Sequence, residues 1–316
     1  MLEYITARKY RHTKHLINLW NSEFRITYPI KKVLFRKFIL EDINFNQDAS
    51  FVALYDNEPV GFIFIKTWID ESGLANENDA AHISLIFVKK EMRNMGIGSD
   101  LLQLAISELK QYRNINTLVV GNEMNRIFSG IPSELNSAAI FFVNKNFIQK
   151  EAVVDMIRVA RNDKIETLSN NELNISIATE DEKDEILQLC VKNGWKREAY
   201  LVNQYYEKGG SGRRIVTGRV DNKIVSFVRF NDENRMPFKA STFDNDKKIG
   251  SINFVKVDSN YQDRNFDVLM NKAAKNYLLK RGCKKIIILA TKDVKFYKSL
   301  GFSAYKYYLQ FELPLN

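Results

Sequence analysis

The chain repeats one long order of expected elements, and this repeat constrains the fold more than any single motif does. Residue patterns in 1–163 predict a strand, two helices, a hairpin, a strand, a glycine turn, a helix, a strand, a short helix and a strand. After a polar stretch at 164–173, which we interpret as a linker, residues 174–316 repeat this order. A chain of 316 residues with 45% hydrophobic residues can form two packed cores. We therefore expect two similar domains in tandem.

The repeat also aligns individual positions of the two halves. The apolar face of the long helix includes Leu101 in the first half, and its counterpart Leu269 stands 168 residues later. Each half is expected to end in a strand that closes its own sheet. These strands are expected at 151–159 and at 304–313.

Residues 93–98, Arg-Asn-Met-Gly-Ile-Gly, join an apolar strand to an amphipathic helix. The start of a helix has unpaired N–H groups and a partial positive charge, which attract phosphate groups. Gly96 and Gly98 lack Cβ atoms, so the backbone can approach an anion closely. The same six residues could equally form a plain, flexible helix start, and alone they do not decide between the two.

With its flanks and the repeat, this turn resembles the GNAT family of acetyl-CoA-dependent N-acetyltransferases. The family motif (R/Q)-x-x-G-x-(G/A) lies between an apolar strand and an amphipathic helix, as residues 93–98 do. A second signature, a short aromatic helix that ends in Gly-Phe, is intact in the second half, whereas Asn146 replaces its glycine in the first. The resemblance implies an α/β (α+β) chain of two tandem GNAT domains. Each domain would be a mixed, mostly antiparallel, splayed sheet flanked by helices.

The resemblance also implies where acetyl-CoA, as a co-substrate, binds. In GNAT proteins the main chain of the strand before the turn pairs with the pantetheine arm, and the turn holds the pyrophosphate. The second half has no glycine in this turn: the 168-residue offset places Arg264 and Phe266 there, and a register from Gln262 places Asn265 and Asp267 there. We therefore expect cofactor binding only in the first half. The expected binding residues are Ile86, Phe87, Val88, Arg93, Asn94, Met95, Gly96, Ile97, Gly98 and Ser99.

His82 is the expected general base, because it begins the strand that leads to the turn. Histone-type GNAT members carry a catalytic glutamate at about this place, and a neutral imidazole can accept a proton near neutral pH. A histidine that only hydrogen-bonds its neighbours is the alternative, and Glu77 and Asp79 are other possible bases. Phe142 stands where many GNAT enzymes carry a proton-donating tyrosine, so the sequence does not identify the general acid. The second half has Tyr297 at that position.

The expected function is transfer of an acetyl group to an amine of a small molecule or peptide, by direct attack of that amine. A non-catalytic acyl-CoA-binding or regulatory protein is one alternative. A tandem-GNAT aminoacyl or peptidyl transferase is another, although those enzymes do not depend on an intact coenzyme A turn. Residues 121–132, "GNEMNRIFSGIP", form an extra segment of the first half, which the second half lacks. This segment could form one side of the acceptor site, or it could be an ordinary surface loop.

The net charge of +9 is concentrated in the second half: residues 1–170 carry +1 and residues 171–316 carry +8. These basic residues are dispersed among acidic ones, which argues against a nucleic acid partner. No apolar run reaches the ~20 residues of a membrane span, and the N-terminus lacks the apolar region of a signal peptide. Two distant cysteines form no metal-ligand spacing. We expect a cytoplasmic protein without a metal, and the sequence leaves its oligomeric state open.

Overall fold

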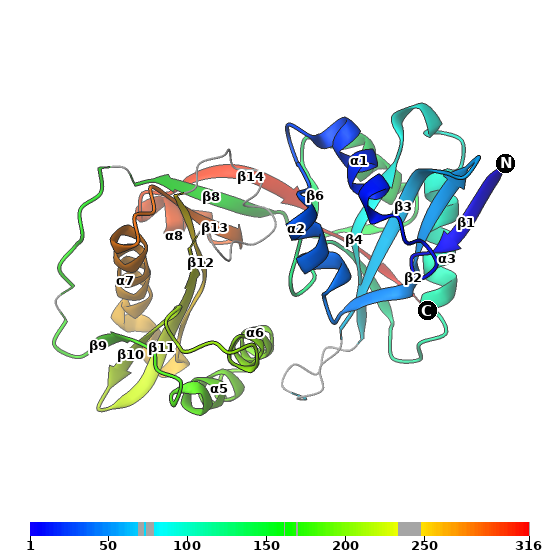
Figure 1. Cartoon of the computed structure of the whole chain (residues 1–316). Coiled ribbons are helices and arrows are strands. Elements are labelled where there is room, and N and C mark those ends of the chain that lie inside the picture. Colours follow the sequence, from blue (N-terminus) through cyan, green and yellow to red (C-terminus); the bar gives the residue numbers. More distant parts are fainter. Residues whose placement is uncertain (69–72, 74–78, 161, 169, 233–247, 316) are drawn as a thin grey trace.

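The computed structural model describes all residues except 69–72, 74–78, 161, 169, 233–247 and 316. In the described residues, seven strands form one sheet and eight form the other. Helices cover both sheets, and the two halves of the molecule lie next to each other (Figure 1). The expectation of two mixed, mostly antiparallel sheets flanked by helices is confirmed.

The first sequence half contains a strand hairpin, the long helix α3 and five shorter elements after it. Its elements are β1 (Leu2–Thr6), α1 (Thr13–Phe24), α2 (Lys32–Phe35), the π-helical turn η1 (Arg36–Leu40), β2 (Phe45–Tyr55), β3 (Glu58–Thr67), β4 (Ala80–Val88), the 3-10 turn η2 (Lys90–Met92), α3 (Ile97–Leu109), β5 (Thr117–Val120), β6 (Ile131–Pro132), α4 (Asn136–Val143), β7 (Ile148–Gln149) and β8 (Val153–Val159).

The second sequence half repeats this order with a longer 3-10 turn before its long helix. Its elements are β9 (Asn174–Ile177), α5 (Lys183–Lys192), α6 (Lys196–Glu207), β10 (Ile215–Val220), β11 (Lys223–Asn231), β12 (Ile249–Val257), the 3-10 turn η5 (Ser259–Arg264), α7 (Phe266–Lys280), β13 (Lys285–Thr291), α8 (Val294–Ser299), β14 (Ser303–Leu309) and β15 (Phe311–Pro314).

Both halves build their hairpin with the same two-residue turn. Asp56 and Asn57 have φ angles of 50° and 67°, and Asp221 and Asn222 have φ angles of 49° and 63°. Two successive residues with positive φ give a turn whose twist matches that of the strands it joins, and Asp and Asn tolerate this conformation well. This turn chemistry is local, so residue patterns alone indicated a hairpin in each half.

The helices bury apolar residues on both faces of each sheet. In the first half, α3 packs Leu101, Ala105 and Leu109 against one face, and α1 packs Leu16 and Trp20 against the other. The spacing of three and four residues places these side chains on one side of each helix. In the second half α7 covers one face, and α5 and α6 cover the other (Figure 1).

The two halves correspond at an offset of 169 residues, one more than the sequence suggested. Helix α3 begins at Ile97 and α7 begins at Phe266, and both residues are 1% exposed. The difference arises because α7 has apolar residues at two adjacent positions. Met270 is fully buried and corresponds to Leu101, whereas Leu269 is only partly buried.

Each sheet contains a strand from the other sequence half. β8 lies between β13 and β14 in the second sheet, and β15 lies between β5 and β7 in the first. The C-terminus therefore lies beside the half that carries the N-terminus (Figure 1). The expectation that residues 151–159 close the first sheet is wrong, and the single strand expected at 304–313 is two strands in different sheets. Alternating side chains identify a strand but not its partner, so the sequence did not reveal this exchange.

The extra segment of the first half, residues 121–132, also pairs with the second sheet. β6 pairs with β14 at Tyr308 and Leu309, and Gly130 lies against this pairing with φ 147°. A Cβ atom on Gly130 would lie 2.3 Å from the carbonyl oxygen of Leu309, so this contact requires glycine. Ser129 and Ile131 are buried. The interpretation of this segment as an ordinary surface loop is therefore wrong.

The strand exchange predicts that the second half stabilises the first. Phe311 in β15 is 1% exposed and packs with Phe142 in the core of the first sheet. Replacement of Phe311 by Ala should lower the free energy of unfolding by about 3–5 kcal/mol, because it leaves a cavity in that core. Urea denaturation measures the change. Tyr307→Ala, at a 48% exposed aromatic in β14, is the control and should change it by less than about 0.5 kcal/mol. Equal losses in both variants would contradict the prediction.

Candidate functional site

Strands β4 and β5 separate part of the way along the first sheet. They pair in parallel only from Ala80 to Ile83, whereas β4 continues along β3 as far as Val88. The register between β3 and β4 shifts at Ser84, which indicates a β-bulge there. A bulge bends its strand and increases the local twist. The side of β4 that faces β5 is therefore open over residues 84–88, which include the expected binding residues Ile86, Phe87 and Val88.

The turn after β4 presents a series of backbone N–H groups without protein partners. Within the described residues, the N–H groups of Asn94 to Ser99 make no recorded hydrogen bond, and the next amide, that of Asp100, bonds to the carbonyl of Gly96. Asn94 and Gly96 have φ angles of 61° and 86°, so the chain turns sharply into α3. Consecutive N–H groups in such a turn form a concave anion-binding site, and the helix dipole of α3 adds partial positive charge.

The side chains of this turn have different surroundings. Ile97 packs into the core, so only its N–H group can take part in binding, whereas Met95 is 61% exposed. A Cβ atom on Gly98 would lie 3.5 Å from the Phe141 ring, at ordinary contact distance. The fold therefore has room for a Cβ atom at position 98. Arg93 donates to the Val88 carbonyl (2.9 Å) and to Glu23 of α1, so it fixes the turn against β4.

The corresponding turn in the second half has a similar backbone but other residues at the two glycine positions. At an offset of 169 residues Asn265, with φ 54°, corresponds to Gly96, and Asp267 corresponds to Gly98. The structure thus follows the register that begins at Gln262. The Asp267 carboxylate accepts a hydrogen bond from the Val268 N–H group (2.8 Å). A negative side chain in the first turn of the helix would repel a phosphate.

His82 lies on β4 just before the strands separate. Its Nδ1 atom is 2.8 Å from the Gly121 carbonyl oxygen at the end of β5, so Nδ1 carries the proton and Nε2 is the proton acceptor. Burial lowers the pKa of His82 to about 4; the Gly121 hydrogen bond opposes this shift, and the charges of Arg197 and Lys66 add to it. The imidazole is therefore neutral at neutral pH.

A buried charged cluster lies next to His82, and the sequence analysis missed it. Lys66 is opposite His82 in the strand register, and its Nζ atom is 2.9 Å from Asp42 and 3.7 Å from Glu123. One Glu123 oxygen accepts hydrogen bonds from the Ser84 hydroxyl (3.1 Å) and the Ile127 N–H (2.8 Å). The other is buried and has no partner among the described residues. A lysine inside the apolar strand "GFIFIKTW" was the available signal, because buried lysines are almost always paired.

The other expected catalytic positions are less favourable. Phe142 is 1% exposed and packs against Phe147 and Phe311, so no proton donor stands there. Burial raises the pKa of Tyr297 to about 12, and its ring packs against Phe302 in the second core. Asp79 is exposed at the start of β4, and Glu77 lies outside the described residues.

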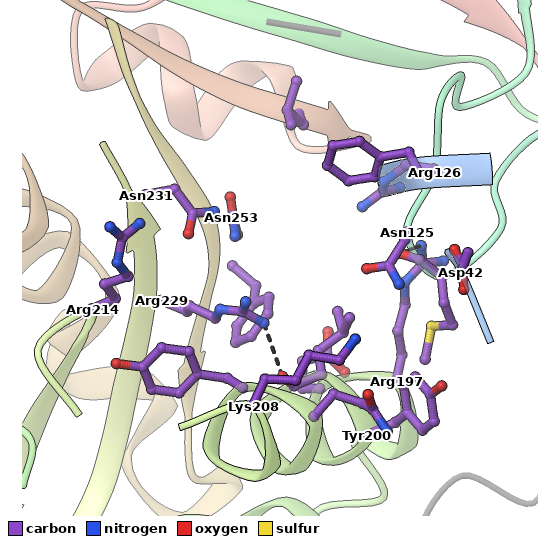
Figure 2. Close-up of a pocket in the computed structure, with 18 of the residues that line it drawn as sticks. Asp42, Asn125, Arg126, Arg197, Tyr200, Lys208, Arg214, Arg229, Asn231 and Asn253 are labelled. Carbon is purple, nitrogen blue, oxygen red and sulfur yellow. Dashed lines mark hydrogen bonds between the residues drawn. The ribbon is translucent and has the colours of Figure 1, made fainter. Parts of the chain in front are cut away.

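A cavity of about 470 Å³ opens between the two halves (Figure 2). Arg197 of α6 holds its two walls together, because it donates to the carbonyls of Asn122 (3.2 Å) and Glu123 (2.7 Å) after β5. Tyr200 packs against Trp68 with ring centroids 5.3 Å apart. The lining residues are Lys37, Phe38, Glu41, Asp42, Met124, Asn125, Arg126, Arg197, Glu198, Tyr200, Leu201, Gln204, Tyr205, Lys208, Arg214, Arg229, Asn231, Asn253, Phe254 and Leu289.

In the part of the chain that the structure describes, no helix combines the length and apolar character of a membrane span. The same residues contain no group of three or more His, Cys, Asp or Glu side chains arranged to hold a metal ion.

Comparison with known proteins identifies one family. The model of the acetyltransferase (GNAT) family matches two separate segments, residues 13–127 and 181–302. These segments correspond to the two halves of the repeat. A search of curated proteins found no match.

Solved structures share the fold of the whole chain at low sequence identity. One is the glucosamine N-acetyltransferase region of a fungal multi-domain GH3 β-N-acetylglucosaminidase, with a TM-score of 0.85 and 16% identity. It covers 99% of this chain, which spans 38% of that longer protein. A GCN5-related N-acetyltransferase from Sphaerobacter thermophilus has a TM-score of 0.72 and 10% identity, with 100% and 96% of the two chains covered. A tandem GNAT protein of the clavulanic acid biosynthesis pathway has a TM-score of 0.68 and 12% sequence identity. The match covers 100% of this chain and 99% of that protein.

The low pKa of His82 predicts a contribution to stability that depends on pH. In the unfolded chain the pKa returns to about 6.5, so below that pH the unfolded state binds a proton that the folded state does not. As the pH falls from 6.5 to 4, His82 should therefore lower the free energy of unfolding, by up to about 3 kcal/mol. Urea unfolding of wild type and His82→Gln across this range measures the difference. The wild type should lose more stability than the variant. His15→Gln, at an exposed position on α1, should follow the wild type, and parallel curves for His82→Gln would contradict the assignment.

Proposed function

Because the chain belongs to the acetyltransferase (GNAT) family, we propose that it is an acetyl-CoA-dependent N-acetyltransferase with one cofactor site, in its first half. The observation that carries this proposal is the set of backbone N–H groups from Asn94 to Ser99 that have no protein partner among the described residues. The diphosphate of coenzyme A is an anion that such a turn can bind. The open side of β4 over residues 84–88 offers main-chain groups for the pantetheine arm.

The two turns support binding in one half only. The first has Gly96 and Gly98, and the second has Asn265 and Asp267 at the corresponding positions. Side-chain volume and a carboxylate both disfavour a diphosphate in the second turn. The second half would then act as a wall of the acceptor site, because it lines the cavity between the halves.

In the proposed reaction the acceptor amine attacks the thioester carbon directly. Acetyl-CoA supplies the activated acetyl group. A carbon–nitrogen bond forms, the carbon–sulfur bond breaks, and the amine loses a proton. We assign His82 to accept this proton at Nε2, since the Gly121 carbonyl fixes the proton of the ring on Nδ1. The thiolate that leaves takes its proton from water, because Phe142 occupies the position of the family tyrosine.

A non-catalytic acyl-CoA-binding protein is the second candidate function. The buried Phe142 favours it, because the chain lacks the usual proton donor at that position. Purified protein with acetyl-CoA and a panel of amines separates the two candidates through detection of free thiol. Amine-dependent thiol release supports the enzyme. Binding of acetyl-CoA without release for any amine supports the second candidate.

Gly98→Asp tests the cofactor site, because it gives the first turn the residue that the second turn carries. The fold has room for a Cβ atom at this position, and an acidic residue at a helix start does not destabilise the helix. The Kd of acetyl-CoA, measured by calorimetry, should rise at least about tenfold through repulsion of the diphosphate. Gln103→Glu adds the same charge at an exposed position of α3 and should leave the Kd unchanged. An unchanged Kd in Gly98→Asp would place the nucleotide elsewhere.

His82→Gln tests the proposed base. The variant should lower kcat by about 100-fold or more and leave the Kd of acetyl-CoA unchanged, because the residue acts only in proton transfer. With a pKa of about 4, His82 should produce no inflection near pH 6.5 in the wild-type rate profile. A kcat close to that of the wild type would remove His82 from the mechanism.

A further inference from the structure

The cavity between the two halves has an excess of positive charge. Its three carboxylates, Glu41, Asp42 and Glu198, each pair with a cation that does not line the cavity. Among the described residues six cationic side chains line it, two from the first half and four from the second: Lys37, Arg126, Arg197, Lys208, Arg214 and Arg229. Of these, Arg214 pairs with Asp232 (2.9 Å), which does not line the cavity.

Arg126 is the cation of the first half that is best placed to bind a ligand. Among the described residues its guanidinium makes one hydrogen bond, from Nη1 to the side-chain oxygen of Asn122 (3.1 Å). Among the described residues no carboxylate lies within ion-pair distance of it. Burial lowers the pKa of Arg126, although the more distant carboxylates of Asp155, Glu123 and Glu198 oppose this shift. Its guanidinium group lies at the edge of the cavity (Figure 2).

Lys208 lies on the other side of the cavity, at the end of α6 (Figure 2). Its side chain is exposed, and no ion pair is recorded for it among the described residues. Arg229 lines the cavity from β11 of the second sheet, where a hydrogen bond from its guanidinium to the Leu201 carbonyl (2.9 Å) fixes its position. The cations thus approach one space from two halves of the chain.

The cavity is also linked to the proposed reaction centre. Asn125 lines it, and the Asn125 carbonyl accepts a hydrogen bond from the Nζ atom of Lys66 (3.2 Å). Lys66 is the strand partner of His82. One side chain therefore connects the cavity wall to the strand position of the proposed base.

We propose that this cavity binds the acceptor amine through an anionic group of the same molecule, a carboxylate or a phosphate, held by Arg126 and Lys208. The volume of about 470 Å³ is typical of sites for small molecules. Guanidinium groups bind carboxylates and phosphates with paired, charge-assisted hydrogen bonds. The inference depends on the proposed function, since it names the class of acceptor for that reaction.

Matched acceptor pairs test the inference on the full-length protein. Tyrosine and tyramine differ by a carboxylate, and phosphoethanolamine and ethanolamine differ by a phosphate. Thiol release gives kcat/KM for each, and calorimetry gives the Kd of each without acetyl-CoA. In at least one pair the anionic member should be preferred by about tenfold or more in kcat/KM or Kd, and the favoured pair identifies the group. Equal values within both pairs, or no binding of any anionic member, would overturn the inference.

Variants then test which residues hold the anionic group. Arg126→Gln keeps a donor for Asn122 but removes the charge, and it should reduce the preference at least about tenfold while the neutral member of the pair is unaffected. Lys208→Gln changes an exposed residue of the other half and should reduce the preference by a smaller factor. Lys110→Gln removes an exposed cation after α3 that does not line the cavity and should leave the preference unchanged. An unaltered preference in both cavity variants would overturn the assignment. The Kd of acetyl-CoA, measured in parallel, reports on the proposed function separately.

Discussion

The exchange of strands between the halves is the constraint on which the rest of the structure depends. β8 and β15 each complete the sheet of the other half, and β6 extends the second sheet from the first half. The backbone hydrogen bonds of these strands fix the halves relative to each other. The cavity between them, with Arg197 bound to the carbonyls after β5, therefore has walls in a set arrangement. A ligand that needs both walls can meet them without ordering two separate domains.

The two halves of the repeat have the same fold, but they differ at the turn before the long helix. In the first copy the N–H groups have no protein partner among the described residues, and in the second an aspartate lies at the helix start. This difference depends on very few residues, because the surrounding strands and helices are alike. β12 and β13, for example, pair in parallel only from Ile249 to Ile252, much as β4 and β5 do from Ala80 to Ile83. Duplication therefore provides two copies of the same fold, and the second copy can form one side of the cavity between the halves.

Local chemistry explains what the sequence predicted well. Hairpin turns with Asp and Asn, helices with apolar faces and the glycine turn all follow from neighbouring residues, and the family match confirms the two tandem copies. The exchange of β8 and β15 was missed because strand patterns do not identify partners. The offset of 169 residues between the two halves was missed because Leu269 and Met270 are both apolar, and either could correspond to Leu101. The buried cluster of Lys66, Asp42 and Glu123 joins residues from three separate segments, so only the folded chain brings it together.

The position of β15 has a consequence for synthesis on the ribosome. The first sheet has a gap between β5 and β7 until residues 311–314 have been translated and have left the exit tunnel. Domains usually fold in the order in which they emerge, but here the earlier copy must wait for the later one. During that interval its two unfinished edges expose unpaired backbone groups, which are sites for nonspecific association and for chaperones. A nascent chain stalled before β15 would thus present an incomplete first sheet, in the half to which we assign the cofactor site.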